Sequence, residues 1–222
     1  TQGISMTTRT IVHLMRHGEV HNPLGVLYGR IAGYHLSDLG HEMAARVADA
    51  LSDHPITHLV SSPLERAQET ATPLSQILGL PIETDERVIE AGNKFEGKTV
   101  GVGPKAFLRP DRWWLLRNPV RPSWGEPYTE IAARMRVAIQ DARDAARGSE
   151  AVVVSHQLPV WTARRMYEQK RYAHDPRNRQ CTLASLTSLT FDDDVFVDLT
   201  YSEPAGDLLP EPLKGNKFAG GA

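Results

Sequence analysis

The chain has 222 residues, of which 41% are hydrophobic and 23% charged, as is typical of a globular protein with one substantial core. Its net charge of -2 and its pI of about 6.5 provide no overall field that would attract nucleic acid or an anionic membrane. The single cysteine, Cys181, excludes an intramolecular disulfide and any multi-cysteine metal site.

The first residues of this sequence are not expected to form a signal peptide. The first ten residues lack the apolar core of a signal peptide, and no stretch approaches the length of a membrane span. Residues 1–5, ahead of Met6, are expected to be a cloning remnant, and the Pro- and Gly-rich residues 202–222 a loosely ordered tail. We therefore expect a soluble, cytoplasmic protein with one domain over residues 6–201, as a monomer or homodimer.

Strands and helices are predicted to alternate along the first part of the chain. Apolar runs and helical periodicity predict strands over residues 10–15 and 57–61 and helices over 37–51 and 62–78. The sequence Ser62-Pro63-Leu64-Glu65 has the pattern of a capping box with proline at the first helical position, which predicts that the second helix begins there. Gly79 and Pro81 predict its end.

The second part continues the alternation after an irregular segment. Residues 82–90 are expected to be extended, and the Gly- and Pro-rich residues 92–127 to form an insertion with a short helix near 103–116. The elements predicted after it are a helix over 127–147, a strand over 151–155 buried on both faces, a helix over 159–169 and a hairpin turning at 192–194. This order predicts an α/β fold, a three-layer α/β/α sandwich with a mostly parallel central sheet and helices on both faces.

Three predicted strands are followed by polar side chains that can bind phosphate or react with it. The strands are followed by Met15-Arg16-His17-Gly18, Ser61–Arg66 and Val154-Ser155-His156-Gln157, and the carboxyl ends of parallel strands meet at one edge of a sheet. Arginine presents forked donors to phosphate oxygens, and a histidine can attack phosphorus to form a phosphohistidine. Glu90, at the end of the next extended run, is a candidate proton donor for a leaving alkoxide.

These motifs resemble the histidine phosphatase superfamily, the group that includes cofactor-dependent phosphoglycerate mutase. RHGE at 16–19, SSPLERAQETA at 61–71 and the apolar strand ending in Ser155-His156 match in order and spacing, from about residue 10 to 190. YGRIAGYHLSDLGHEMA and GEPYTEIAARM resemble two further family segments. The chain departs from the usual family pattern at Gln157, where a glycine is common, and in the short spacing between Glu19 and Asn22.

The resemblance implies a phosphoglycerate mutase-like fold and roles for individual residues. His17 would be the nucleophile and Glu90 the proton donor, and His156 would assist catalysis and bind phosphate. The phosphate pocket would be completed by Arg16, Arg66 and Asn22. The resemblance implies no cofactor and no metal.

Each of these residues also has a simpler interpretation. His17 could be an ordinary loop histidine and His156 a hydrogen-bonded core histidine. The two arginines could pair with Glu65 and Glu69 on the surface, and Glu90 could be a strand-end charge. The three motifs in register favour the catalytic interpretation.

Two other patterns suggest different ligands and are set aside. His17 and His21, like His54 and His58, have the four-residue spacing of helical metal ligands, but glycine and proline nearby oppose continuous helices there. Arginines interleave with tryptophans within the insertion, a pattern found in nucleic-acid-binding segments, but the acidic balance of the chain opposes that partner. We instead expect the insertion to select the substrate, with contacts from Tyr28, Arg30, Trp113 and Trp114.

The predicted function is therefore a metal-independent phosphomonoesterase that acts on a small phosphate ester through a phosphohistidine on His17. A phosphoglycerate mutase is the alternative within enzymes; the segment LRNPVRPSWGEP offers no clear counterpart of the Arg- and Pro-rich segment of such mutases, which favours the phosphatase. A catalytically idle interaction module is a third hypothesis, and the presence of the core residues argues against it.

Overall fold

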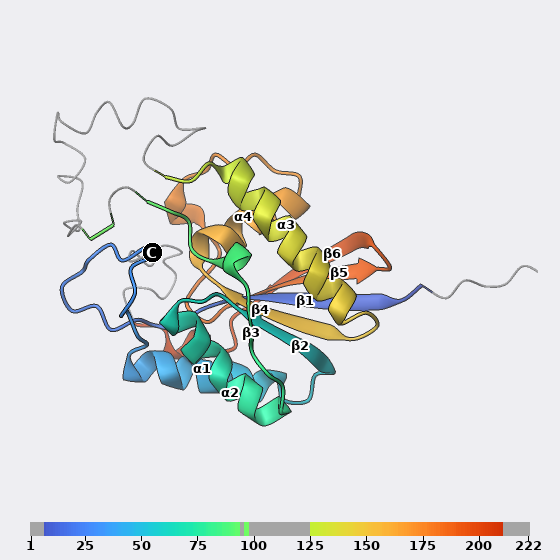
Figure 1. Ribbon diagram of the computed structural model, residues 1–222, viewed down its shortest axis with the longest axis horizontal. Coiled ribbons are helices and arrows are strands. Elements are labelled where there is room, and N and C mark those ends of the chain that lie inside the picture. The colour runs from blue at the N-terminus through green and yellow to red at the C-terminus, as the bar shows by residue number, and fades with distance from the viewer. Residues whose placement is uncertain (1–6, 94–95, 98–124, 211–222) are drawn as a thin grey trace, which may run out of the picture.

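The computed structural model describes residues 7–93, 96–97 and 125–210 (Figure 1). Within them, six strands form one sheet in the order β3-β2-β4-β1-β5-β6. The strands are β1 (Arg9–Arg16), β2 (Ile56–Ser61), β3 (Glu83–Thr84), β4 (Glu150–Ser155), β5 (Leu186–Asp192) and β6 (Val195–Ser202). The α-helices are α1 (Asp38–Leu51), α2 (Glu65–Leu78), α3 (Tyr128–Ala145) and α4 (Gln157–Tyr167).

The sheet is mixed, with a parallel half and an antiparallel half. The strands β3, β2, β4 and β1 pair in parallel, whereas β5 is antiparallel to β1 and forms the predicted hairpin with β6. Central strand β4 is buried at all six positions, as its continuous apolar sequence predicts. The parallel half therefore brings the carboxyl ends of β1, β2 and β4 to one edge.

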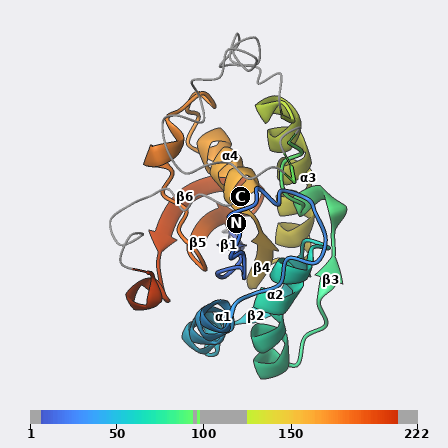
Figure 2. The same cartoon turned by 90° about the vertical axis from the view of Figure 1, so that its left-hand side faces the viewer.

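Helices cover both faces of the sheet, which confirms the predicted three-layer α/β/α fold (Figures 1 and 2). On one face, Ile131, Met135 and Ile139 of α3 pack with Val12 and other β1 and β4 residues. The core on the opposite face joins α1 and α2 to the other sides of these strands. Two apolar cores hold the central strands in place and fix the directions in which they end.

Helix α2 begins later than the capping-box pattern predicts. Its first residue is Glu65 and its N-cap is Leu64, which has no side-chain capping bond. The Ser62 hydroxyl oxygen instead lies 2.8 Å from Nε2 of His156, and accepts only a long 3.4 Å bond from the Leu64 amide. The prediction of a helix start at Ser62 was wrong because this serine interacts with a neighbouring strand end.

The chain between α2 and α3 contains less strand than predicted. Strand β3 has two residues and is followed by a short 3-10 helix, η1 (Glu86–Val88). The short helix expected near 103–116 lies outside the described residues.

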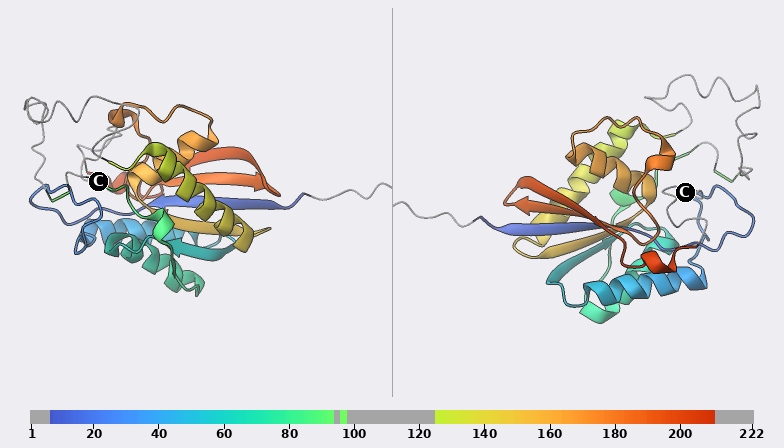
Figure 3. Two further views of the ribbon diagram at one scale, coloured as in Figure 1. Left: turned by 45° about the horizontal axis from the view of Figure 1, so that its top comes forward. Right: turned by 180° about the vertical axis from the view of Figure 1, so that it is seen from behind.

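The first part of the expected tail is packed against the domain. A 3-10 helix, η5 (Gly206–Leu208), follows β6, and Ala205 and Leu209 are buried in the core beside α1. Arg46 of α1 donates to both carboxylate oxygens of Asp207 at 2.9 Å, and η5 lies alongside α1 in Figure 3. The expectation of a loosely ordered tail was wrong for residues 203–210, since two apolar side chains there are buried.

Candidate active site

Three strand ends meet in the parallel half of the sheet. Arg16 at the end of β1 lies in register with Ser155 at the end of β4, and the His17 amide donates to the Ser155 carbonyl at 3.1 Å. The Ser62 amide, just after β2, donates to the Val154 carbonyl at 2.9 Å. The main chain thereby places Arg16, His17 and His156 beside the start of α2, which carries Arg66.

His17 is fully buried and its two ring nitrogens have different surroundings. Nδ1 lies 2.8 Å from the Gly18 carbonyl, and because a carbonyl only accepts, Nδ1 carries the proton. Nε2 therefore holds the lone pair, and it has no hydrogen-bond partner among the described residues. Burial and the charges of Arg66 and Arg16 lower the pKa of His17 well below its ordinary value of 6.5, so the ring is neutral at neutral pH.

Gly18 has a steric role next to His17. A Cβ at this position would lie 2.6 Å from the Gly40 carbonyl oxygen, and a Cβ on Gly40 would collide with the Glu19 carbonyl oxygen. The Gly18 amide donates to Thr70 Oγ1 at 3.1 Å. The loop after β1 is thus pressed against both helices of this face, α1 and α2, and this contact fixes the backbone that carries the His17 ring.

The guanidinium groups of Arg16 and Arg66 are buried, and some of their hydrogen-bond donors have no partner among the described residues. Each is tethered to a backbone carbonyl: Arg16 Nη1 to Cys181 at 2.8 Å, and Arg66 Nη2 to Gly29 at 2.5 Å. Nε of both residues and Nη1 of Arg66 have no partner within the described ranges. The Arg66 guanidinium also stacks over the Tyr28 ring, 4.6 Å from its centroid. Buried, unmatched cationic donors of this kind suit an anion such as phosphate.

The surface ion-pair interpretation of these two arginines does not hold. Glu65 accepts from the Gly33 amide at 3.0 Å, and Glu69 accepts from the Leu36 amide at 2.7 Å. No ion pair of Arg16 or Arg66 is present in the described part of the chain. The carboxylates that could have neutralised them instead bind the loop before α1.

His156 lies across from His17, with 5.1 Å between the ring centroids. It is fully buried as the N-cap residue of α4, Nε2 is 2.8 Å from the Ser62 hydroxyl, and Nδ1 has no partner among the described residues. Burial, followed by the charge of Arg66, lowers its pKa well below the ordinary value. The amino end of α4 adds a partial positive charge at this point.

Glu90 provides the carboxyl group of the cluster. It is 3% exposed, Oε1 accepts from the Ala91 amide at 2.8 Å, and Oε2 has no partner in the described part of the chain. Burial raises its pKa above the ordinary 4.5, although Arg66 and Arg16 oppose that shift. The protonated form, which can donate a proton, is thereby favoured.

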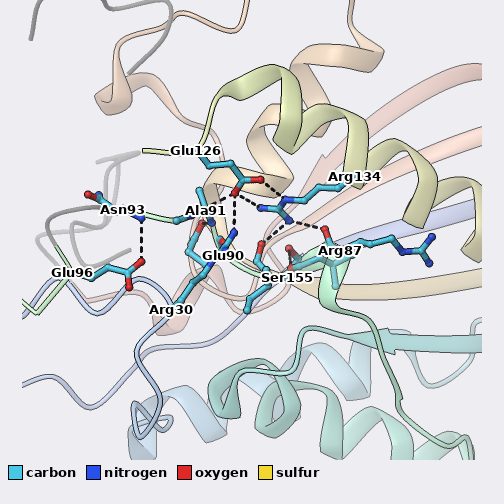
Figure 4. A network of polar contacts seen from close by, with 12 residues as sticks. Arg30, Arg87, Glu90, Ala91, Asn93, Glu96, Glu126, Arg134 and Ser155 are labelled. Carbon is cyan, nitrogen blue, oxygen red and sulfur yellow. Dashed lines mark hydrogen bonds and ion pairs between the residues drawn. The ribbon is translucent and has the colours of Figure 1, made fainter. Parts of the chain in front are cut away.

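A network of arginines and a glutamate holds the backbone around Glu90 (Figure 4). Arg134 of α3 donates to the carbonyls of Arg87 at 2.6 Å and Ile89 at 2.8 Å, and Arg30 donates to the Glu90 carbonyl at 2.7 Å. Glu126 accepts from both Arg134 and Arg30. The segment that carries Glu90 is therefore fastened to α3 and to the loop after β1.

The remaining predicted site residues lie in different settings. Both polar atoms of Asn22 bond to Val26 within their own turn, at 2.8 and 3.0 Å, so its role in phosphate binding stays a prediction. Tyr28 is buried beneath Arg66, and Arg30 is engaged in the network around Glu90. Trp113 and Trp114 lie outside the described residues.

Two residues near the cluster were not assigned a role from sequence. Arg179 is 8% exposed, donates to His174 Nε2 at 2.8 Å and Gln157 Oε1 at 3.3 Å, and interacts electrostatically with Glu90. Gln157 donates at 3.4 Å to the Cys181 carbonyl that also holds Arg16. Gln157 stood out in sequence only as a departure from the family pattern, and Arg179 lies in an irregular segment where periodicity gives no signal.

An open cavity of about 570 Å³ adjoins the Glu90 network. Its described lining includes Arg30 and three carboxylates, Glu96, Glu126 and Glu130. Gly92 and Asn93, which follow Glu90 in the chain, also line it.

Comparison with known proteins identifies the family. The six-stranded sheet with helices on both faces is the architecture of phosphoglycerate mutase-like proteins. Residues 12–203 match the histidine phosphatase superfamily (branch 1), and the chain belongs to this superfamily. Uncharacterized protein Rv0525 of Mycobacterium tuberculosis is 56% identical over 200 residues, which cover 90% of this chain and 99% of that protein.

Two further relatives have names that state an activity. The probable phosphoglycerate mutase GpmB of Shigella boydii is 30% identical, over 70% of this chain and 79% of its own. The structure of the mycobacterial glucosyl-3-phosphoglycerate phosphatase Rv2419c complexed with VO3 superposes with a TM-score of 0.69 at 25% identity, covering 86% of this chain and 97% of that one. Among the described residues, no helix is long and apolar enough to cross a membrane.

Proposed function

We propose that the protein is a phosphomonoesterase that hydrolyses a small phosphate ester through a phosphohistidine on His17. The observation that carries the proposal is the unpartnered, neutral Nε2 of His17 among the free donors of Arg16 and Arg66. A lone pair at this position can attack phosphorus while the two guanidinium groups neutralise the phosphoryl oxygens.

The proposed reaction has two steps. In the first, His17 Nε2 forms a bond to phosphorus, the bond from phosphorus to the ester oxygen breaks, and the Glu90 carboxyl transfers its proton to the departing alkoxide. In the second, water attacks the phosphohistidine, Glu90 accepts the proton of that water, and the bond from phosphorus to nitrogen breaks to release phosphate. Arg16, Arg66 and His156 bind the phosphoryl oxygens throughout both steps.

The alternative is phosphoglycerate mutase-type transfer, in which a second hydroxyl takes the place of water. The resemblance to a probable phosphoglycerate mutase over 70% of this chain supports it. The relative that is named a glucosyl-3-phosphoglycerate phosphatase supports hydrolysis. Both reactions would use the same nucleophile and the same phosphate pocket.

We propose that the cavity beside the Glu90 network selects the substrate, together with the insertion over residues 92–127. The position of Arg30 in the lining of this cavity and the stacking of Tyr28 against Arg66 support a role for both residues in the choice of leaving alcohol. If the assignment is correct, Arg30→Ala and Trp113→Ala change relative activity across a panel of esters. Unchanged ratios would contradict it.

The test of the proposed function is phosphate release from a panel of esters that includes 3-phosphoglycerate, measured for wild type and His17→Ala without added metal. Loss of the covalent nucleophile is expected to lower turnover by about 10³-fold or more. Isomerisation of 3-phosphoglycerate with its bisphosphate primer, in the absence of phosphate release, would favour the mutase. Inactivity in both assays would favour the third hypothesis, a catalytically idle interaction module.

A further inference from the structure

A second cluster of ligand-type side chains lies at the amino end of β4, whereas the phosphate site lies at its carboxyl end. His13 of β1 and His54, in the loop between α1 and β2, both face Glu150, the first residue of β4. His13 Nε2 is 2.7 Å from Glu150 Oε2, and His54 Nδ1 is 2.8 Å from the same oxygen. The three ligand atoms all lie within 4.8 Å of one another.

In the structure, His54 lies next to His13 and not next to His58, the partner that the sequence spacing suggests. His54 and His58 are four residues apart, but His58 lies on β2 and its Nδ1 is 3.7 Å from Glu83. His54 instead meets His13, with 5.7 Å between the ring centroids. His13 and Glu150 are 137 residues apart in the chain, so only the sheet brings them together.

We propose that His13, His54 and Glu150 form a binding site for a divalent transition-metal ion of the zinc class. Two imidazole nitrogens and one carboxylate oxygen are a donor set that zinc accepts, with a fourth position left for water. In this structure His13 Nε2 donates to the Glu150 carboxylate, and a bound metal would displace that proton. The Ser188 hydroxyl, 2.7 Å from Nδ1, can accept from a proton on Nδ1 and so leave the Nε2 lone pair for the metal. The four-residue histidine spacings in the sequence include His54 but neither His13 nor Glu150, so they do not indicate this triad.

The backbone around the three ligands is held in place. The Glu150 amide donates to the Pro55 carbonyl at 3.1 Å, and the His54 amide donates to the Leu51 carbonyl at 3.0 Å. Tetrahedral ligands about 2.0–2.2 Å from a metal lie roughly 3.3–3.6 Å apart, so both rings need to withdraw from the Glu150 oxygen by roughly 0.5–0.9 Å. The side chains of His13 and Glu150 are 6% and 12% exposed and that of His54 is 42% exposed, so solvent reaches the site through His54.

The test is zinc binding by the full chain, freed of any affinity tag and treated with EDTA before the assay. Zinc is titrated against a competing chromogenic chelator for wild type, His54→Gln and the control His58→Gln. We expect wild type to bind zinc, His54→Gln to lose affinity by at least about tenfold, and His58→Gln to retain it. His17 and His156 are unchanged in all three proteins, so the comparison isolates the proposed triad.

A spectroscopic arm uses cobalt in place of zinc. Wild type and His58→Gln should show the strong visible absorption of a four-coordinate cobalt ion, and His54→Gln should lack it. Glu150→Gln provides a second variant, and circular dichroism checks that each variant is folded. The proposal is wrong if wild type binds no zinc, or if His54→Gln binds zinc as tightly as wild type does. In either case the triad serves only as a set of structural hydrogen bonds. Equal losses in both histidine variants would also overturn it.

Discussion

At the scale of single residues, the chemistry depends on which polar atoms have no partner. Nε2 of His17, Nδ1 of His156 and Oε2 of Glu90 are buried without hydrogen bonds among the described residues, as are three arginine nitrogens. Leaving one such group unsatisfied costs about 1–3 kcal/mol, so a ligand that pairs with several of them would gain binding free energy there. In the proposed mechanism, the phosphoryl oxygens would accept from the arginine donors while the His17 lone pair attacks phosphorus.

The pH dependence of turnover follows from His17 and Glu90. His17 must be neutral, which requires a pH above its pKa, and that pKa is shifted well below the ordinary 6.5. Glu90 must be protonated, which requires a pH below its pKa, and that pKa is raised above the ordinary 4.5. We expect kcat/KM for an alkyl phosphate to fall at acidic pH through His17 and at alkaline pH through Glu90.

The variant Glu90→Gln tests the alkaline limb. Turnover of an alkyl phosphate should fall by about 10²–10⁴-fold and lose its alkaline limb, since no proton reaches the alkoxide. The first burst of nitrophenolate from p-nitrophenyl phosphate should be much less affected, because this leaving group departs unprotonated. Equal losses for both substrates would show that Glu90 does not act as the acid.

At the scale of elements, helix α3 is proposed to position Glu90 from a distance. Arg134→Met removes the donors that hold the carbonyls of Arg87 and Ile89, while the methionine keeps much of the side-chain volume. We expect kcat to fall by about 10–100-fold with KM changed little, because a misplaced acid affects the transition state more than binding.

The control for this prediction lies on the same helix. Arg136→Met alters an exposed arginine two residues away and should leave kcat within about twofold of wild type. If Arg134→Met raises KM and leaves kcat unchanged, Arg134 acts on substrate binding, and the positioning role is excluded.

The contact between the loop after β1 and helix α1 can be tested through stability. Gly18→Ala places a Cβ 2.6 Å from the Gly40 carbonyl oxygen, so the backbone must shift. We expect the free energy of unfolding to fall by about 1–3 kcal/mol in urea denaturation. Gly92→Ala, whose Cβ would meet no atom closer than 3.6 Å, should change it by less than about 0.5 kcal/mol. A stable Gly18→Ala protein would mean that the loop can move away from α1.

At the scale of the whole molecule, the segment after β6 completes the apolar core between the sheet and helices α1 and α2. Leu209 is 6% exposed and packs in the core beside α1, so Leu209→Ala is expected to lower the free energy of unfolding by about 2 kcal/mol. Val195 is 65% exposed, and Val195→Ala should have little effect by the same measurement. Equal stability of Leu209→Ala and wild type would show that this segment does not contribute to the core.

Much of the fold could be predicted from local patterns. Hydrophobic periodicity predicts the alternation of strands and helices and the hairpin of β5 and β6. The length of its apolar run predicts β4. The start of α2 was misplaced because the Ser62 hydroxyl binds His156, a residue 94 positions away. Local capping rules cannot anticipate a competing partner that only the sheet supplies.

The candidate site was predictable where residues sit at strand ends and unpredictable elsewhere. Arg16, His17, Arg66 and His156 follow strands that the sequence displays, and parallel pairing then brings them together. Arg179 and the Arg134–Glu126–Arg30 network depend on irregular segments and on α3, so neither spacing nor periodicity indicates them. The His13–His54–Glu150 triad likewise exists only through the pairing of β1 with β4 and the loop before β2.

In the proposed mechanism, Nε2 of His17 forms a covalent bond to phosphorus. The most direct measurement is rapid acid-free quenching of the enzyme during turnover of a ³²P-labelled ester, followed by denaturing gel analysis. We expect a label on the protein that is stable to base and lost in acid, as is typical of a phosphohistidine, and that is absent from His17→Asn. Turnover by wild type without any labelled protein, or an undiminished label on His17→Asn, would contradict it.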